Sequence, residues 1–91
     1  MTIYVNDTGV TISLETKFDI QTMTKFEMHV KKPDGRLRKW TASLSGTTAM
    51  VYTLITGDIN IPGVYTLQAY VEGPGVRLHG LPVSFTASHS H

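Results

Sequence analysis

Apolar and polar residues alternate strictly over residues 25–31 of this chain. In the run Lys-Phe-Glu-Met-His-Val-Lys, every even position is apolar and every odd position is polar. Since successive side chains of a strand point to opposite faces of a sheet, the pattern predicts a strand with one buried and one solvated face. The following Pro33-Asp34-Gly35 favours a tight turn, because proline presets φ and glycine accepts a positive φ. With the partly alternating residues 36–42, this segment predicts a β-hairpin.

Further strand-like runs recur at short intervals along the chain. They cover residues 2–5, 10–14, 50–54, 64–71, 76–79 and 81–87, separated by segments rich in glycine, proline, asparagine and aspartate. The run 64–71 is the longest and favours a central strand. Residues 16–24 fit either a short loop or a helical turn. Short strands at this spacing predict an all-β fold, either a sandwich or a small barrel.

One corner narrows the choice of fold. Tyr65 follows the Pro62-Gly63 corner at the entrance of the longest run. In immunoglobulin-like sandwiches, a tyrosine at this corner bonds its hydroxyl to the backbone just upstream, and a core residue follows two positions later. Leu67 would hold that core position, and Trp40 is the natural large core side chain. We therefore expect an immunoglobulin-like antiparallel β-sandwich of about seven strands.

The composition fits one domain of this kind. The 91 residues are 41% hydrophobic and 16% charged, unlike the charge-rich and apolar-poor composition of disordered segments. We expect the domain to span residues 1–87 and residues 88–91 to form an exposed tail. No apolar run approaches the roughly 20 residues that a membrane span needs, so no membrane association is expected.

No signature of catalysis or of metal binding stands out. The acidic residues are scattered and lie mostly at turns, and neither a Gly-x-Ser-x-Gly elbow nor a phosphate-binding loop is present. The sequence has no cysteine, which excludes a thiol nucleophile and a thiolate metal site. His29 and His79 lie in predicted strands without ligand spacing. We expect a protein that is not an enzyme and that uses no cofactor and no metal.

Basic residues concentrate on the predicted hairpin. Five of the eight lysines and arginines lie within nine positions, opposed only by Asp34. Such charge either protects an edge strand from pairing with another sheet or docks an acidic partner. A net charge of +1 and the lack of interleaved aromatic residues argue against nucleic acid. The residues we predict to bind a partner are Lys31, Lys32, Arg36, Arg38, Lys39 and Trp40. The loop at 47–48 and the turn at 73–75 are weaker candidates.

The turn and core residues resemble those of a known group of proteins. The similarity involves residues 4–9, 30–35, 40, 57–58, 63–71, 79–80 and 83–85. In this order they resemble short phage and prophage proteins, and also the immunoglobulin-like N-terminal domain of upper baseplate proteins of phages that infect Gram-positive hosts. The resemblance covers nearly the whole chain, and its motifs specify the fold better than the role.

The resemblance implies a structural protein of a tailed-phage virion that is assembled in the host cytoplasm. We expect a capsid decoration or cement protein that docks on neighbouring subunits of the major capsid protein. A tail or baseplate connector, bound to tail or baseplate subunits, is one alternative, and self-association of the chain is open as well. A carbohydrate-binding adhesive module is the other alternative, with Tyr4, Tyr52, Tyr65 and Tyr70 as candidate sugar-stacking residues.

Overall fold

A computed structural model describes residues 3–89 of the chain. These residues form strands and no helix, which confirms the predicted all-β class. The strands are β1 (Ile3–Tyr4), β2 (Thr11–Glu15), β3 (Lys25–Lys31), β4 (Leu37–Thr41), β5 (Ser43–Ser45), β6 (Ala49–Thr53), β7 (Gly63–Gly73), β8 (Val76–His79) and β9 (Val83–Ser88). Their number in this part of the chain is nine rather than about seven. No helix that could cross a membrane occurs among these residues.

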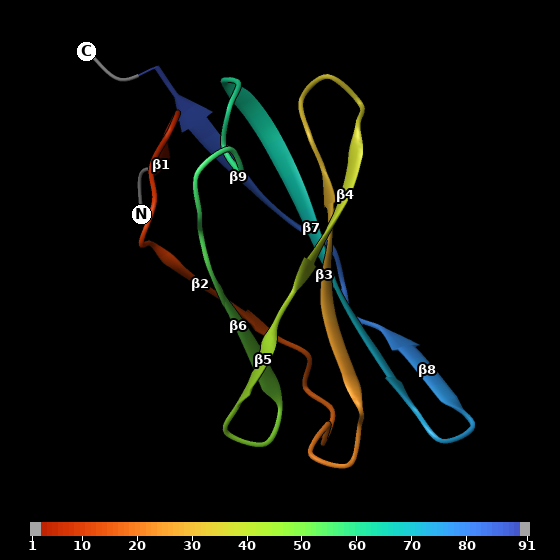
Figure 1. The fold of residues 1–91 in the computed structure, drawn as a ribbon. Helices are drawn as coiled ribbons and strands as arrows, with labels where there is room; N and C mark the ends of the chain where they lie inside the picture. Colours follow the sequence, from red (N-terminus) through yellow and green to blue (C-terminus); the bar gives the residue numbers. More distant parts are fainter. Residues whose placement is uncertain (1–2, 90–91) are drawn as a thin grey trace.

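The strands form two sheets (Figure 1). The larger sheet has the order β1-β9-β7-β3-β4, and β8 also pairs with β7; the smaller sheet has the order β2-β6-β5. The long strand β7 is central, as predicted, because β3 pairs with one edge while β9 and then β8 pair with the other. All pairs are antiparallel except that of β1 with β9, which is parallel.

The predicted hairpin is present as β3 and β4. Its turn is closed by hydrogen bonds from the Gly35 N–H to the Lys32 carbonyl and from the Lys32 N–H to the Arg36 carbonyl, both 2.9 Å long. Gly35 has a φ of 87°, the region that glycine adopts without steric cost. The alternation of β3 holds as well, because Met28 and Val30 are buried in the core.

The second strand predicted for the hairpin, residues 36–42, is present as β4 (Leu37–Thr41), but the strand that follows it was not predicted. The chain leaves the larger sheet after β4 and enters the smaller sheet as β5. Ala42 lies between the two strands, is buried, and donates its N–H to the Phe26 carbonyl at 2.9 Å. No turn residue marks the change, because the strand direction continues and only the pairing partner differs.

The predicted corner at Tyr65 is confirmed. The Tyr65 hydroxyl donates a 2.7 Å hydrogen bond to the Ile61 carbonyl and accepts one of 3.3 Å from the Ile61 N–H. The Tyr65 ring is buried and stacks on Phe85 with 5.2 Å between ring centroids. Leu67 is buried two positions later, as expected.

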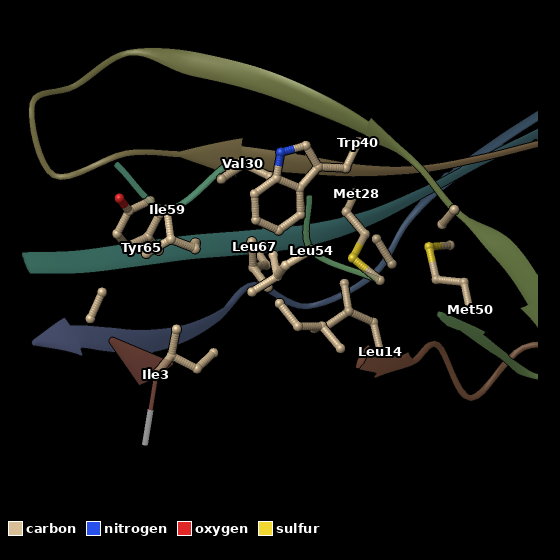
Figure 2. Packing of buried hydrophobic residues seen from close by; sticks show 14 of the residues in the cluster. Ile3, Leu14, Met28, Val30, Trp40, Met50, Leu54, Ile59, Tyr65 and Leu67 are labelled. Atoms are coloured by element: carbon tan, nitrogen blue, oxygen red, sulfur yellow. The ribbon is translucent and has the colours of Figure 1, made fainter. Parts of the chain in front are cut away.

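The core is built from side chains of both sheets. Leu14 and Met50 from the smaller sheet join Met28 and Leu67 from the larger one (Figure 2). Trp40 points into this cluster and stacks on Tyr52 of β6 with 4.8 Å between centroids, so it joins the two sheets directly.

The remaining boundaries shift slightly. Residues 16–24 form turns without a helix, and Ile20 within them is fully buried. Ser88, the first residue of the predicted tail at 88–91, is instead the last residue of β9, and its carbonyl accepts the Val5 N–H. Residues 90–91 and residues 1–2 lie outside the described part of the chain.

Candidate docking surface

The six predicted partner-binding residues do not share one face. His29 lies between the buried Met28 and Val30, and Lys39 pairs in register with it, so Lys39 and Lys31 lie on the outer face of the larger sheet, away from the core. Arg38 pairs with the buried Val30 on the opposite face, but its side chain is exposed at the β4 edge. Arg36 follows the turn and is exposed.

Lys32 and Trp40 are not available to a partner. Lys32 is only 7% exposed and donates its ammonium group to Asn60 Oδ1 at 2.9 Å. Trp40 is 5% exposed and packs against Tyr52. Both occupy even positions that continue the core-facing alternation of the hairpin, and for this reason we remove them from the predicted surface.

A groove lies beside the remaining basic residues, on the outer face of the larger sheet. It encloses about 630 Å³ and we call it the outer groove. Residues of three adjacent strands and the segment between β8 and β9 line it, namely His29, Val30, Lys31, Leu37, Arg38, Lys39, Thr66, Gln68 and Pro82. None of these lining residues is acidic, whereas three of them are lysine or arginine.

Two smaller hollows adjoin the same hairpin. One, of about 380 Å³, lies along the β4 edge and is lined in part by Tyr52 and Asp58. The other, of about 400 Å³, lies near the turn and is lined in part by Pro33 and Val64. The weaker candidates at 47–48 and 73–75 lie at the other end of the molecule from the β3–β4 turn (Figure 1).

The cations of the outer groove lack an acidic partner within residues 3–89. Asp34 pairs with Arg36 at 3.2 Å, so it does not neutralise the groove. Neither Lys31 nor Lys39 has a carboxylate within 4.0 Å in the described part of the chain. Leu37 provides an apolar wall beside them and is 72% exposed. The groove therefore combines lysines that have no close ion-pair partner in residues 3–89 with exposed apolar surface.

A cluster of rings adjoins the outer groove at His29. The His29 ring stacks on Tyr70 with 4.7 Å between centroids, and Tyr70 contacts His79 at 4.9 Å. His29 Nε2 lies 3.4 Å from a Glu27 carboxylate oxygen. The Tyr70 hydroxyl donates to Glu72 at 2.7 Å. This hydrogen bond raises the pKa of Tyr70 and lowers that of Glu72.

The tyrosine rings are largely covered by neighbouring side chains. Tyr65 is buried, Tyr52 is stacked on Trp40, and Tyr70 has histidine rings against it. Tyr4 is 41% exposed. A sugar that stacks on aromatic faces would thus find little free ring surface on three of the four tyrosines.

The free edge of β4 carries a local block against further strand pairing. The backbone hydrogen bonds from Lys32 to Arg36 and from Ala42 to Phe26 show which residue pairs of the hairpin are hydrogen-bonded. Hydrogen-bonded and non-hydrogen-bonded pairs alternate along an antiparallel hairpin, and Leu37 belongs to a non-hydrogen-bonded pair, so its N–H and carbonyl point away from β3. Arg38 Nη1 donates to that Leu37 carbonyl at 2.9 Å. An added strand would have to displace the guanidinium first.

Within residues 3–89, no three histidine, aspartate or glutamate side chains converge on a position where they could hold a metal ion. Charge and apolar contact are what the outer groove offers.

Sequence reasoning missed part of the groove. Thr66 and Gln68 alternate with buried residues of β7, which marks the outer face of that strand. Their position opposite Lys31 and His29 comes from the register of β3 with β7, which the sequence pattern does not contain. Pro82 enters the groove because β8 and β9 follow each other along one edge of β7.

Comparisons with protein-family models, with curated proteins and with solved structures gave no match. The resemblance to phage proteins therefore stays a prediction from the sequence. The inference of a function rests on the outer groove and the residues around it.

Proposed function

We propose that this chain is a non-enzymatic, immunoglobulin-like docking module of a tailed-phage virion, and that it decorates the capsid. The observation that carries the docking role is the outer groove, where Lys31 and Lys39 stand beside the exposed Leu37 without an acidic partner in residues 3–89. Surfaces that bring positive charge together with apolar contact area suit a protein partner. The virion location rests on the sequence resemblance.

The pairing of the strands supports the immunoglobulin-like assignment. In such sandwiches one sheet contains strands B, E and D and the other contains C, F and G. Here β2, β6 and β5 correspond to the first set, and β3, β7 and β9 to the second. The tyrosine corner lies at the entrance of β7, the equivalent of strand F. β4 then corresponds to the additional strand beside C in variable-type domains, while β1 and β8 extend the same sheet.

Docking of this kind acts by stoichiometric binding. A rigid domain that contacts two neighbouring shell subunits binds the assembled shell and not the separate subunits. Its binding free energy therefore stabilises the assembled state by mass action. A stable contact of this type needs roughly 1,000 Å² of buried surface, so the outer groove would form the centre of a larger footprint.

The test is cryo-electron microscopy of particles from the strain that encodes this chain, with an antibody to the chain as an independent label. We expect density for the sandwich at regular positions on the capsid, with the outer groove against a neighbouring subunit. Density confined to a ring on the tail would indicate a tail or baseplate connector instead of a capsid decoration protein. Particles without the chain would overturn the proposal.

A further inference from the structure

We infer that the outer groove binds an extended acidic segment of the partner protein, with an apolar side chain packed within the groove and carboxylates paired with Lys31 and Lys39. This inference rests on the proposed docking function and defines the chemistry of the partner. The alternatives are a second copy of this chain and a partner strand that extends the sheet, and both are outcomes of the test below.

Charge complementarity identifies the acidic character. Lys31, Arg38 and Lys39 line the groove, no acidic residue does, and neither lysine has an ion-pair partner within residues 3–89. Glu27, the nearest acid along β3, already faces Lys25 at 3.9 Å and His29 at 3.4 Å. A segment with two carboxylates would complete the pairs that this chain leaves open.

The shape of the groove favours an extended segment. The lining residues come from β4, β3, β7 and the segment around Pro82, so the groove crosses the strands rather than following one of them. Neighbouring strands are about 4.8 Å apart, so this path is roughly 15 Å long. It would hold about four or five residues in extended conformation. Leu37 and Pro82 stand at its two ends in strand order, and each is an exposed apolar contact.

The geometry also places the segment on the face of the sheet rather than on its edge. Arg38 covers the Leu37 carbonyl at 2.9 Å, and β4 leaves the larger sheet after Thr41. A strand added at the β4 edge would thus have few backbone groups to pair with, and one of them, the Leu37 carbonyl, already accepts a hydrogen bond. On the face, Lys31 and Lys39 can pair with the segment without breaking an ion pair present among residues 3–89.

The experiment is a titration of the full ¹⁵N-labelled chain with a capped Asp-Glu-Leu-Asp-Glu peptide, followed by NMR. We expect saturable shift changes at the amides of Lys31, Leu37, Thr66 and Gln68. A capped Asn-Gln-Leu-Asn-Gln peptide, matched in size and lacking charge, should bind about tenfold more weakly or not at all, because two exposed ion pairs account for a change of this size. Binding of the acidic peptide should weaken as salt is added.

Matched variants separate a local effect from net charge. The double variant Lys31→Gln with Lys39→Gln should weaken binding of the acidic peptide about tenfold. The control double variant, Lys17→Gln with Arg77→Gln, changes the net charge equally at positions that do not line the groove and should leave the affinity unchanged. The spectrum of each free variant verifies that the fold is intact.

Three outcomes would overturn the inference. They are equal affinity for the acidic and the amide peptide, shift changes confined to the edge of β4, and equal weakening by both double variants. Concentration-dependent shifts at the groove without peptide would assign it to a second copy of this chain instead. The virion experiment gives a separate answer: particles that lack the chain refute the virion role even if the peptide binds, and particles in which the groove faces solvent refute the groove assignment alone.

Discussion

Removing the hydroxyl of Tyr65 tests whether the corner before β7 stabilises the fold. In the Tyr65→Phe variant the ring keeps its place on Phe85, so the apolar packing is preserved. What is lost is the 2.7 Å hydrogen bond to the Ile61 carbonyl and the 3.3 Å bond from the Ile61 N–H. Both groups of Ile61 are then left without this partner at the entrance of the central strand.

The expected cost follows from those two bonds. A typical intramolecular hydrogen bond contributes about 0.5–1.5 kcal/mol net, so the free energy of unfolding should fall by about 1–3 kcal/mol. For a domain of this size, each 1 kcal/mol lowers the melting temperature by about 4–8 °C. The slope of unfolding free energy against urea should stay the same, because the surface exposed on unfolding hardly changes.

Urea unfolding followed by tryptophan fluorescence measures this change, since Trp40 is the single tryptophan and is buried in the core. Tyr4→Phe is the matched control, because Tyr4 is 41% exposed and its substitution should cost less than about 0.5 kcal/mol. A Tyr65→Phe variant as stable as the Tyr4→Phe control would refute the reasoning. It would mean that water hydrogen-bonds to the N–H and carbonyl of Ile61 as favourably as the Tyr65 hydroxyl does.

Two further predictions concern alkaline pH and a glycine. Burial, together with the hydrogen bond to Asp58, raises the pKa of Tyr52 above its ordinary value of 10.0, so above pH 10 the unfolded chain loses this proton before the folded one. The free energy of unfolding should therefore fall with rising pH, by up to about 1.4 kcal/mol per pH unit for this group. In urea titrations between pH 9 and 11, Tyr52→Phe should reduce the slope, and an unchanged slope would contradict the assignment. Gly63→Ala should lower the melting temperature more than Gly35→Ala, because the new Cβ at Gly63 would lie 2.7 Å from Pro33 Cβ whereas the one at Gly35 has no atom within 4 Å. Both glycines have a positive φ, 130° at Gly63 and 87° at Gly35, so backbone strain destabilises both variants, and the steric contact adds to it at Gly63 alone. Circular dichroism melts showing the reverse order would disprove the steric argument.

The sequence allowed prediction of features that depend on neighbours along the chain. The alternation over β3, the turn at Gly35 and the corner at Tyr65 each involve residues within a few positions of one another, and each is present in the structure. Local preference and tertiary packing agree at these points. That agreement is why the all-β class could be recognised without an alignment.

Pairing between distant strands could not be predicted in the same way. The parallel pair of β1 with β9 and the passage of the chain from β4 to β5 have no turn or composition signal, because they depend on which edges remain free in the folded sheet. Lys32 shows a different limit. The cluster of basic residues around it led us to predict an exposed surface, whereas the structure buries it at a position that continues the core-facing alternation of β3. The amide of Asn60 provides the partner that makes its burial possible.

The parallel pair of β1 with β9 has a mechanical consequence. Ile3 and Tyr4 lie beside Ala87 and Ser88, and the Val5 N–H extends the ladder to the Ser88 carbonyl. When parallel strands are pulled from the start of one and the end of the other, the force acts along the strands, so the hydrogen bonds between them are loaded together rather than broken one after another. A pulling force applied at β1 and at the end of β9 therefore shears the hydrogen bonds of this pair, and these bonds must break before the force acts on the core.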